Sequence, residues 1–196
     1  MRQDNMHRAL MNSAIHVVSE QGIHKATTKA LAQNSGVNEA YIYRLFSGKE
    51  DLLKQTFADI DNQLVRFLSD LIDDYQQRDT DAEQAIRDIV LDLWHFILSD
   101  CEKCQFFIRY YYSQHFLDYS VDERRQAYLP IIERLQPMML PDVDVWEEIN
   151  QVYDVLFPTA ARVLRGELQN NADLEKTILR RLQAFLLSML RSSDTK

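Results

Sequence analysis

The side chains of this sequence that are best suited to bind another macromolecule lie close together between residues 38 and 49. Tyr41, Tyr43 and Arg44 would project from the outer face of a short helix. The inner, apolar face of the same helix would consist of Ile42, Leu45 and Phe46. A globular domain gains little from exposing two tyrosines beside an arginine. Because hydroxyl and guanidinium groups donate hydrogen bonds to phosphates and base edges, this face is suited to binding DNA.

Two short helices joined by a tight turn would hold this face in position. Thr27 or Thr28 is a suitable N-cap for the first helix, and the small Ala32 would let the second helix approach it closely. Gly36 can adopt the positive φ angle that the turn requires. Asn38 is a suitable N-cap for the second helix. The pattern predicts a helix-turn-helix, a motif that places its second helix in the major groove of DNA.

An ordinary helical hairpin is the alternative interpretation, because short helix pairs are common in helical proteins. Three features favour DNA binding instead. The small residue, the glycine and the apolar residues occur together at the spacing that the motif needs. Exposed tyrosines lie beside Arg44. Finally, Gly48 and Lys49 begin a further helix whose first amide groups suit an anion.

The charge of the chain is divided unevenly along its length. The chain has 196 residues and a formal net charge of −8. Residues 1–56 carry seven Lys and Arg against five acidic residues, whereas the remainder carries 15 against 25. An acidic body would repel DNA and help to orient a weakly cationic head. Because such a head binds DNA only weakly by itself, we expect two heads to act together.

Helical periodicity extends through the whole chain and predicts an all-α fold of about nine helices. Residues 4–21 would brace the helix-turn-helix and complete a three-helix head, and residues 49–77 would form one long helix that leaves it. The remaining helices are expected at residues 81–99, 101–119, 121–139, 144–168 and 174–190. Pro130 would start a new turn or kink its helix, and Pro158 would kink another.

Other classes of function receive little support from the composition. No apolar run is long enough to cross a membrane and the first residues do not resemble a signal peptide, so we expect no membrane association and a cytoplasmic location. Cys101 and Cys104 should therefore be reduced. Zinc takes four ligands, and the sequence has no second pair of cysteines or clustered histidines, so we expect no metal and no cofactor. No nucleophile accompanied by a base is visible, which makes an enzyme the weaker hypothesis.

One pattern of residues covers about the first 55 positions. It consists of Thr27-Thr28, Leu31-Ala32, Ser35-Gly36-Val37, Ile42-Tyr43, Phe46, Lys49 and Glu50-Asp51-Leu52-Leu53. This pattern resembles the tetracycline-repressor-like (TetR) family of bacterial regulators. The resemblance implies a homodimer that binds an inverted-repeat operator in double-stranded DNA and usually represses transcription until a small molecule releases it. Ala40, Tyr41 and Leu45 depart from the residues usual in the family, which leaves the operator sequence open.

The resemblance and the helix geometry agree on some roles in DNA binding. Tyr43 and Lys49 would contact phosphates, with Thr28 contributing at the start of its helix. Base edges are the expected targets of Glu39, Tyr41 and Arg44. A favourable charge at a helix N-terminus explains Glu39 equally well. The full predicted DNA-binding set is Thr27, Thr28, Lys29, Asn38, Glu39, Ala40, Tyr41, Tyr43, Arg44 and Lys49.

The body is expected to hold a small-molecule effector, and we divide it from the head after residue 50, giving domains of residues 1–50 and 51–196. Aromatic residues are dense enough to line a pocket, with Arg109 as a polar group. The candidates are Trp94, Phe107, Arg109, Tyr110, Tyr111, Phe116, Tyr128 and Trp146. Ordinary core packing is the alternative explanation. A regulator controlled by a protein partner, with no ligand-sized cavity in its body, is the alternative function.

The last two helices are expected to form the dimer. Residues 174–190 carry two apolar stripes, more than one core face requires, and a four-helix bundle from two protomers would bury the surplus. The interface candidates are Leu156, Val163, Leu174, Ile178, Leu182, Phe185 and Met189. Packing of the terminal helix wholly within its own protomer is the alternative.

Overall fold

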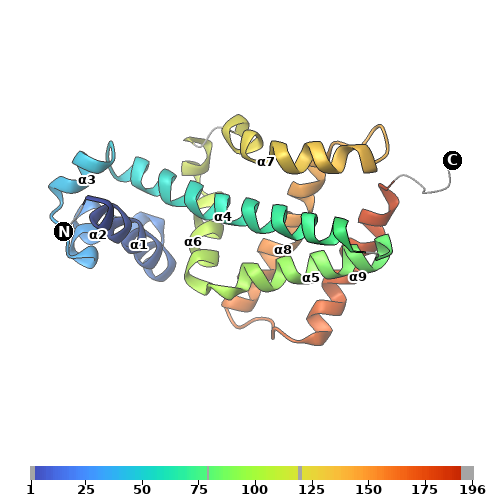
Figure 1. Cartoon of the computed structure of the whole chain (residues 1–196). Coiled ribbons are helices and arrows are strands. Elements are labelled where there is room, and N and C mark those ends of the chain that lie inside the picture. The colour runs from blue at the N-terminus through green and yellow to red at the C-terminus, as the bar shows by residue number, and fades with distance from the viewer. Residues whose placement is uncertain (1–2, 79, 119–120, 191–196) are drawn as a thin grey trace. The chain divides into compact units, whose positions relative to one another are not determined.

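The computed structural model describes residues 3–78, 80–118 and 121–190, and these residues form nine α-helices and three short 3-10 helices (Figure 1). They contain no β-strand, only one isolated bridge between Met139 and Leu190. The predicted all-α fold is therefore confirmed. Within these ranges, no helix is both long and apolar enough to cross a bilayer.

The chain divides into two compact units, and the division does not follow the order of the sequence. The first unit comprises residues 1–63 and 100–121, and the second comprises residues 64–99 and 122–196. The long helix α4 (Lys49–Gln77) continues from one unit into the other, as the sequence predicted for residues 49–77 (Figure 1). A functional boundary after residue 50 stays a prediction.

The first unit combines the predicted three-helix head with a later part of the chain. Its elements are α1 (Gln3–Gln21), η1 (Ile23–Lys25), α2 (Thr28–Ser35), α3 (Ala40–Leu45), the start of α4, α6 (Cys101–Tyr111) and η2 (Gln114–Asp118). Helix α6 packs against α1. The ring of Phe57 on α4 stacks on Phe107 and Tyr110 of α6, with centroid distances of 4.7 and 4.8 Å. Packing against α6 therefore stabilises the three-helix head in addition to the contacts among its own helices.

The second unit is a bundle built on α5 (Ala82–Ser99). It also contains α7 (Val121–Leu135) except for its first residue, together with η3 (Gln136–Met138), α8 (Val145–Leu164) and α9 (Ala172–Ser188). Helix α5 packs against both α8 and α9. The buried Trp94 on α5 donates a hydrogen bond from Nε1 to Asn170 Oδ1 at 3.0 Å, just before α9 begins. The rings of Phe67 on α4 and Phe96 on α5 stack at 4.1 Å.

Several expected helix boundaries differ from the observed ones, among them the end of α8, which lies at Leu164 and not at residue 168. The helix expected over residues 101–119 ends at Tyr111, because Ser113 Oγ donates to Tyr110 O and accepts the amide of His115, which turns the chain into η2. The helix expected over residues 121–139 ends at Leu135. No new turn starts at Pro130: α7 continues through it, and α8 continues through Pro158. Both prolines are exposed, so water can satisfy a backbone carbonyl that loses its partner.

Candidate DNA-binding helix-turn-helix

The first helix of the motif is fixed by a cap and by burial. Of the two threonines, Thr27 is the N-cap of α2, and its Oγ1 accepts the amide of Ala30 at 3.1 Å. Leu31 and Ala32 are buried, as the apolar pattern predicted. The buried Ser13 on α1 donates from Oγ to Leu31 O at 2.8 Å, which ties α1 to α2.

The turn between the two helices depends on a glycine and a serine. Gly36 ends α2 with φ 66° and ψ 15°, the left-handed conformation that the sequence predicted. Ser35 Oγ donates to Ala32 O at 3.0 Å and accepts the amide of Val37 at 3.2 Å. Val37 is buried, so the chain re-enters the core immediately after the turn. These contacts set the angle between α2 and α3.

The second helix, α3, starts at Ala40, so Glu39 and not the expected Asn38 occupies the N-cap position, although Asn38 still accepts a hydrogen bond from the first turn. The side chain of Asn38 accepts the amide of Ala40 at 2.9 Å. Glu39 already has helical backbone angles, with φ −52° and ψ −33°, but its side chain makes no capping hydrogen bond. Ile42 and Phe46 are buried and Leu45 is half-buried. The predicted inner face of α3 is therefore the one that packs against the head.

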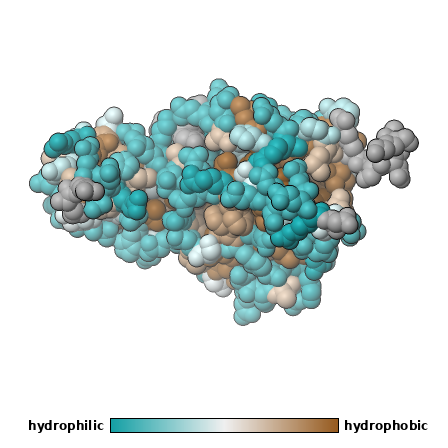
Figure 2. Space-filling view, viewed as in Figure 1, coloured by the Kyte–Doolittle hydropathy of each residue, from teal (hydrophilic) through white to brown (hydrophobic). Residues whose placement is uncertain are grey.

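The outer face of α3 presents the polar groups that the sequence predicted. The side chain of Tyr43 is 63% exposed, the largest exposed fraction among the exposed large hydrophobic residues of the described chain. Arg44 is exposed, and its Cζ lies 5.7 Å from the ring centroid of the half-buried Tyr41. That distance is within the range of a cation–π interaction. In Figure 2 the surface at this end of the molecule is mostly hydrophilic.

The start of α4 adds a cation to the same region. Lys49 is the first residue of α4, and its Nζ lies 3.3 Å from Glu50 Oε1. Burial favours a higher pKa for Glu50, but hydrogen bonds from the backbone and from Lys49 outweigh it and lower the pKa. Asp51 Oδ2 accepts the amide of Ser47 at 2.8 Å. The first amide groups of α4 therefore already have a carboxylate beside them. The Lys49–Glu50 ion pair joins a half-buried lysine to an exposed glutamate at the surface, where such pairs contribute little free energy.

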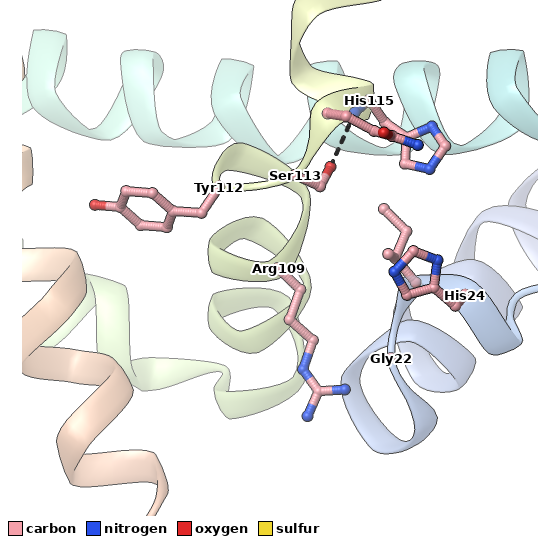
Figure 3. A pocket seen from close by; sticks show the side chains of 8 residues that line it. Gly22, His24, Arg109, Tyr112, Ser113 and His115 are labelled. Carbon is pink, nitrogen blue, oxygen red and sulfur yellow. Dashed lines mark hydrogen bonds between the residues drawn. The ribbon is translucent and has the colours of Figure 1, made fainter.

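The predicted effector-pocket residues fall in both units. In the first unit, Phe107 and Tyr110 are buried against Phe57, and the rings of Tyr111 and Phe116 pack at 4.6 Å. Aromatic packing therefore accounts for these side chains. Arg109 differs from them because it lines an open pocket of about 450 Å³ (Figure 3). The other residues that line this pocket are Gly22, Ile23, His24, Tyr112, Ser113, Gln114 and His115.

In the second unit the predicted pocket residues surround an arginine that the sequence did not indicate. Arg124 is 2% exposed, and its Cζ lies 5.1 Å from the Tyr128 centroid and 5.3 Å from that of Trp146. Arg124 also donates to Asn150 Oδ1 at 3.0 Å. In the sequence Arg124 lies within a charged run and carries no signal of burial. Tyr128 and Trp146 therefore pack around a buried cation, and Trp94 is buried elsewhere in the same unit.

The dimer candidates divide into buried and partly exposed residues. Leu156, Ile178 and Leu182 are at most 2% exposed and Met189 is 8% exposed, so these four side chains belong to the core of their own protomer. They cannot supply the outer surface of an interface, which corrects the expected set. Among the other candidates, partial exposure is found at Val163, Leu174 and Phe185.

Among the described residues, the two cysteines and the possible metal ligands do not form a site together. Cys104 is buried, and burial raises the pKa of its thiol to about 12, with the charges of Cys101 and Asp100 adding to the effect. Cys101 is exposed. In the part of the chain that the structure describes, no three His, Cys, Asp or Glu side chains are grouped so that they could hold a metal ion.

Comparison with known proteins agrees with this geometry. Residues 10–56 match the family of bacterial regulatory proteins called tetR. The fatty acid metabolism regulator protein of Bacillus subtilis (strain 168) is 27% identical over 75 residues, which is 38% of this chain and 37% of that protein. The alignment thus spans little more than a third of this relative.

Two solved structures share the fold over almost their whole length. The crystal structure of a tetR-family transcription regulator from Shewanella sp. PV-4 is 16% identical with a TM-score of 0.73, covering 95% of this chain and 98% of that one. The structure of the Bacillus subtilis transcriptional regulator FadR in complex with stearoyl-CoA is 19% identical with a TM-score of 0.66, covering 90% and 97%. At these identities the likeness establishes the fold.

Proposed function

We propose that this chain is a bacterial transcription regulator of the TetR family, the family that residues 10–56 match, and that it binds an inverted-repeat operator as a homodimer and is released by a small molecule. The outer face of α3 is the observation that carries this proposal. It combines the exposed Tyr43 and Arg44 on a helix whose inner face is fixed by Ile42 and Phe46. We expect repression of the genes beside the operator, and action in the cytoplasm without catalysis.

Within the head, we propose a division between contacts that position the protein and contacts that read sequence. Tyr43 and Lys49 would bind phosphates, which fixes the register of the protein without selecting a sequence. Arg44 would bind guanine through both of its terminal nitrogens, an interaction worth about 1–3 kcal/mol of discrimination. Thr28 and Lys29 at the start of α2 would add phosphate contacts. Glu39 and Ala40 would lie close to the bases.

A dimer is needed because the head has few cations. Two heads on one palindromic site would be separated by about one turn of DNA, 34–36 Å, or by a longer spacing on a longer site. We propose that α8 and α9 pair with the same helices of a partner through Val163, Leu174 and Phe185, which are partly exposed on these helices. Introducing a charge at Phe185 should then produce monomers in sedimentation experiments and weaken operator binding.

A fatty acyl-CoA is the first effector to test. The chain is 27% identical over 75 residues to a fatty acid metabolism regulator, and a regulator of the same fold was solved with stearoyl-CoA. Addition of stearoyl-CoA should weaken operator binding, and operator should weaken stearoyl-CoA binding by the same factor. If no acyl-CoA or other small molecule changes operator affinity, control by a protein partner becomes the better proposal.

Selection of bound sequences from a random duplex pool, repeated over a series of salt concentrations, tests the proposal directly. An enriched inverted repeat whose affinity falls steeply with salt is the expected result. Arg44→Ala should relax the preference at one position of each half-site, while Tyr43→Phe should weaken binding to all sequences alike. Arg165→Ala is the matched control, because Arg165 is an exposed arginine of the second unit. Weak binding with no enriched sequence would contradict the proposal.

A further inference from the structure

The open pocket of about 450 Å³ in the first unit has a lining that is rich in hydrogen-bond donors. Arg109 contributes a guanidinium, His24 and His115 contribute imidazoles, and Gln114 contributes an amide. None of the eight residues that line the pocket is acidic. Its volume is in the range of pockets that hold small ligands. A group of donors without a carboxylate among them is suited to an anion.

Arg109 is already held in place before any ligand arrives. Its Nη1 donates to Val18 O, the last turn of α1, at 2.9 Å. Gly22 makes room for it: a Cβ on Gly22 would lie 3.3 Å from Arg109 Nη1. A guanidinium has five N–H donors, so the bond to Val18 leaves others for an anion. Because the side chain is fixed, less conformational entropy is lost when a ligand binds.

The histidines come from two different segments around the same opening. His24 belongs to η1, which follows α1, and His115 belongs to η2, which follows α6. Figure 3 shows both imidazoles on one side of the end of α6, with the guanidinium of Arg109 beside Gly22, whereas the ring of Tyr112 points away from them. The amide of His115 donates to Ser113 Oγ at 3.2 Å, which fixes the turn that carries it. The charge of His115 also helps to lower the pKa of Glu50, a residue that does not line the pocket.

We propose that this pocket binds a small oxyanion, the phosphate or carboxylate group of a metabolite, through Arg109, His24 and His115. The two walls belong to the segment that leads into the helix-turn-helix and to the end of α6, so the anion would join them. The inference goes beyond the proposed function: it requires neither an operator nor a dimer. It therefore stands or fails separately from DNA binding.

Nuclear magnetic resonance of the histidine rings gives a direct test on the full-length protein. Inorganic phosphate is added at constant ionic strength, and the Cε1–H signals of the five histidines are followed. Saturable shifts of His24 and His115 are expected, while His95 of the second unit stays unchanged. Equal, non-saturating shifts of all histidines would overturn the proposal. A response of His24 and His115 to duplex DNA but not to phosphate would also overturn it, because the anion would then be the DNA backbone.

Two variants separate binding from folding. Arg109→Gln should weaken phosphate binding about tenfold or more, the usual effect of losing a charged hydrogen bond. Because Arg109 also supports α1, His24→Gln provides a second variant: His24 is exposed, so its replacement should leave the fold intact and still weaken binding. Arg165→Gln is the matched control, since it removes an exposed arginine of the other unit. Unchanged affinity in His24→Gln and in a folded Arg109→Gln would exclude the site.

Discussion

Tyr41 provides a sharp test of how the outer face of α3 works. Its ring lies 5.7 Å from Arg44 Cζ and is half-buried, whereas Arg44 is exposed. We therefore expect the ring to hold the guanidinium in a fixed direction, so that Tyr41 contributes to DNA recognition through Arg44 and makes no base contact of its own. The alternative is a direct contact between Tyr41 and the DNA.

Tyr41→Leu removes the aromatic face and retains an apolar side chain. A cation–π pair at an exposed site contributes about 0.5–1 kcal/mol. Two heads act on one operator, so the expected loss is about 1–2 kcal/mol, or about a 5- to 30-fold rise in the dissociation constant. Fluorescence anisotropy with the selected operator measures this change. Thermal unfolding of the same variant shows whether the half-buried position has also affected stability.

A double-mutant cycle decides between the two roles of Tyr41. If Tyr41 acts through Arg44, then Tyr41→Leu should change operator affinity little in a protein that already carries Arg44→Ala. Tyr43→Leu serves as the control, because a phosphate contact by Tyr43 should be lost to the same extent in both backgrounds. Full additivity of Tyr41→Leu and Arg44→Ala would refute the positioning role and make Tyr41 a DNA contact in its own right.

Three further predictions concern the supports of the motif and the cysteines. Thr27→Ala removes the cap bond to Ala30 and should lower the free energy of unfolding by about 1 kcal/mol; thermal unfolding measures the loss, and Thr27→Ser should restore most of it. Gly36→Ala should cost about 1 kcal/mol for its left-handed backbone alone, because nothing lies within 4 Å of the added Cβ. Gly36→Asn should cost less, and equal stability of all three proteins would contradict this account. Iodoacetamide should label the exposed Cys101 and leave the native Cys104 unmodified, because its thiol has a pKa of about 12 and stays protonated; Cys101→Ser should abolish labelling of the folded protein, and labelling of Cys104 in that variant would show that the site opens.

Elements with strong local signals could be predicted from the sequence. Helix α4 was expected at residues 49–77 and has those bounds, because its apolar residues recur at three- and four-residue steps without a Gly or Pro. The end of α6 was missed because the hydrogen bonds of the Ser113 side chain replace the helical pattern there. The spacing of apolar residues along the sequence does not reveal where a side chain competes with the backbone for hydrogen bonds.

The candidate site shows the same contrast between local and distant signals. The helix-turn-helix follows from residues adjacent in sequence, so its cap at Thr27 and its turn at Gly36 could be predicted. The pocket depends on contacts between distant segments: Arg109 bonds to Val18, 91 positions earlier in the chain. A single sequence carries no signal of that approach. The burial of Arg124 was hidden for the same reason, since Asn150 on α8 is one of the groups that satisfy it.

Control of the head by the body is restricted by how the chain passes between the two units. It does so within α4, after residue 63, and again at residues 99–100 and 121–122. The first crossing lies within an unbroken helix, α4, which begins at Lys49, four residues after the end of α3. The second lies at Asp100, whose side chain caps α6 by accepting the amide of Lys103 at 3.0 Å. A ligand bound in the second unit can change operator affinity only if it favours one conformation of these connecting segments, or of the side chains packed against them, over another. Since α6 packs on α1, we expect a displacement of the start of α6 to be passed on to the head. Removing the Asp100 cap should then reduce the effect of the ligand on operator affinity, while operator affinity in the absence of ligand is retained.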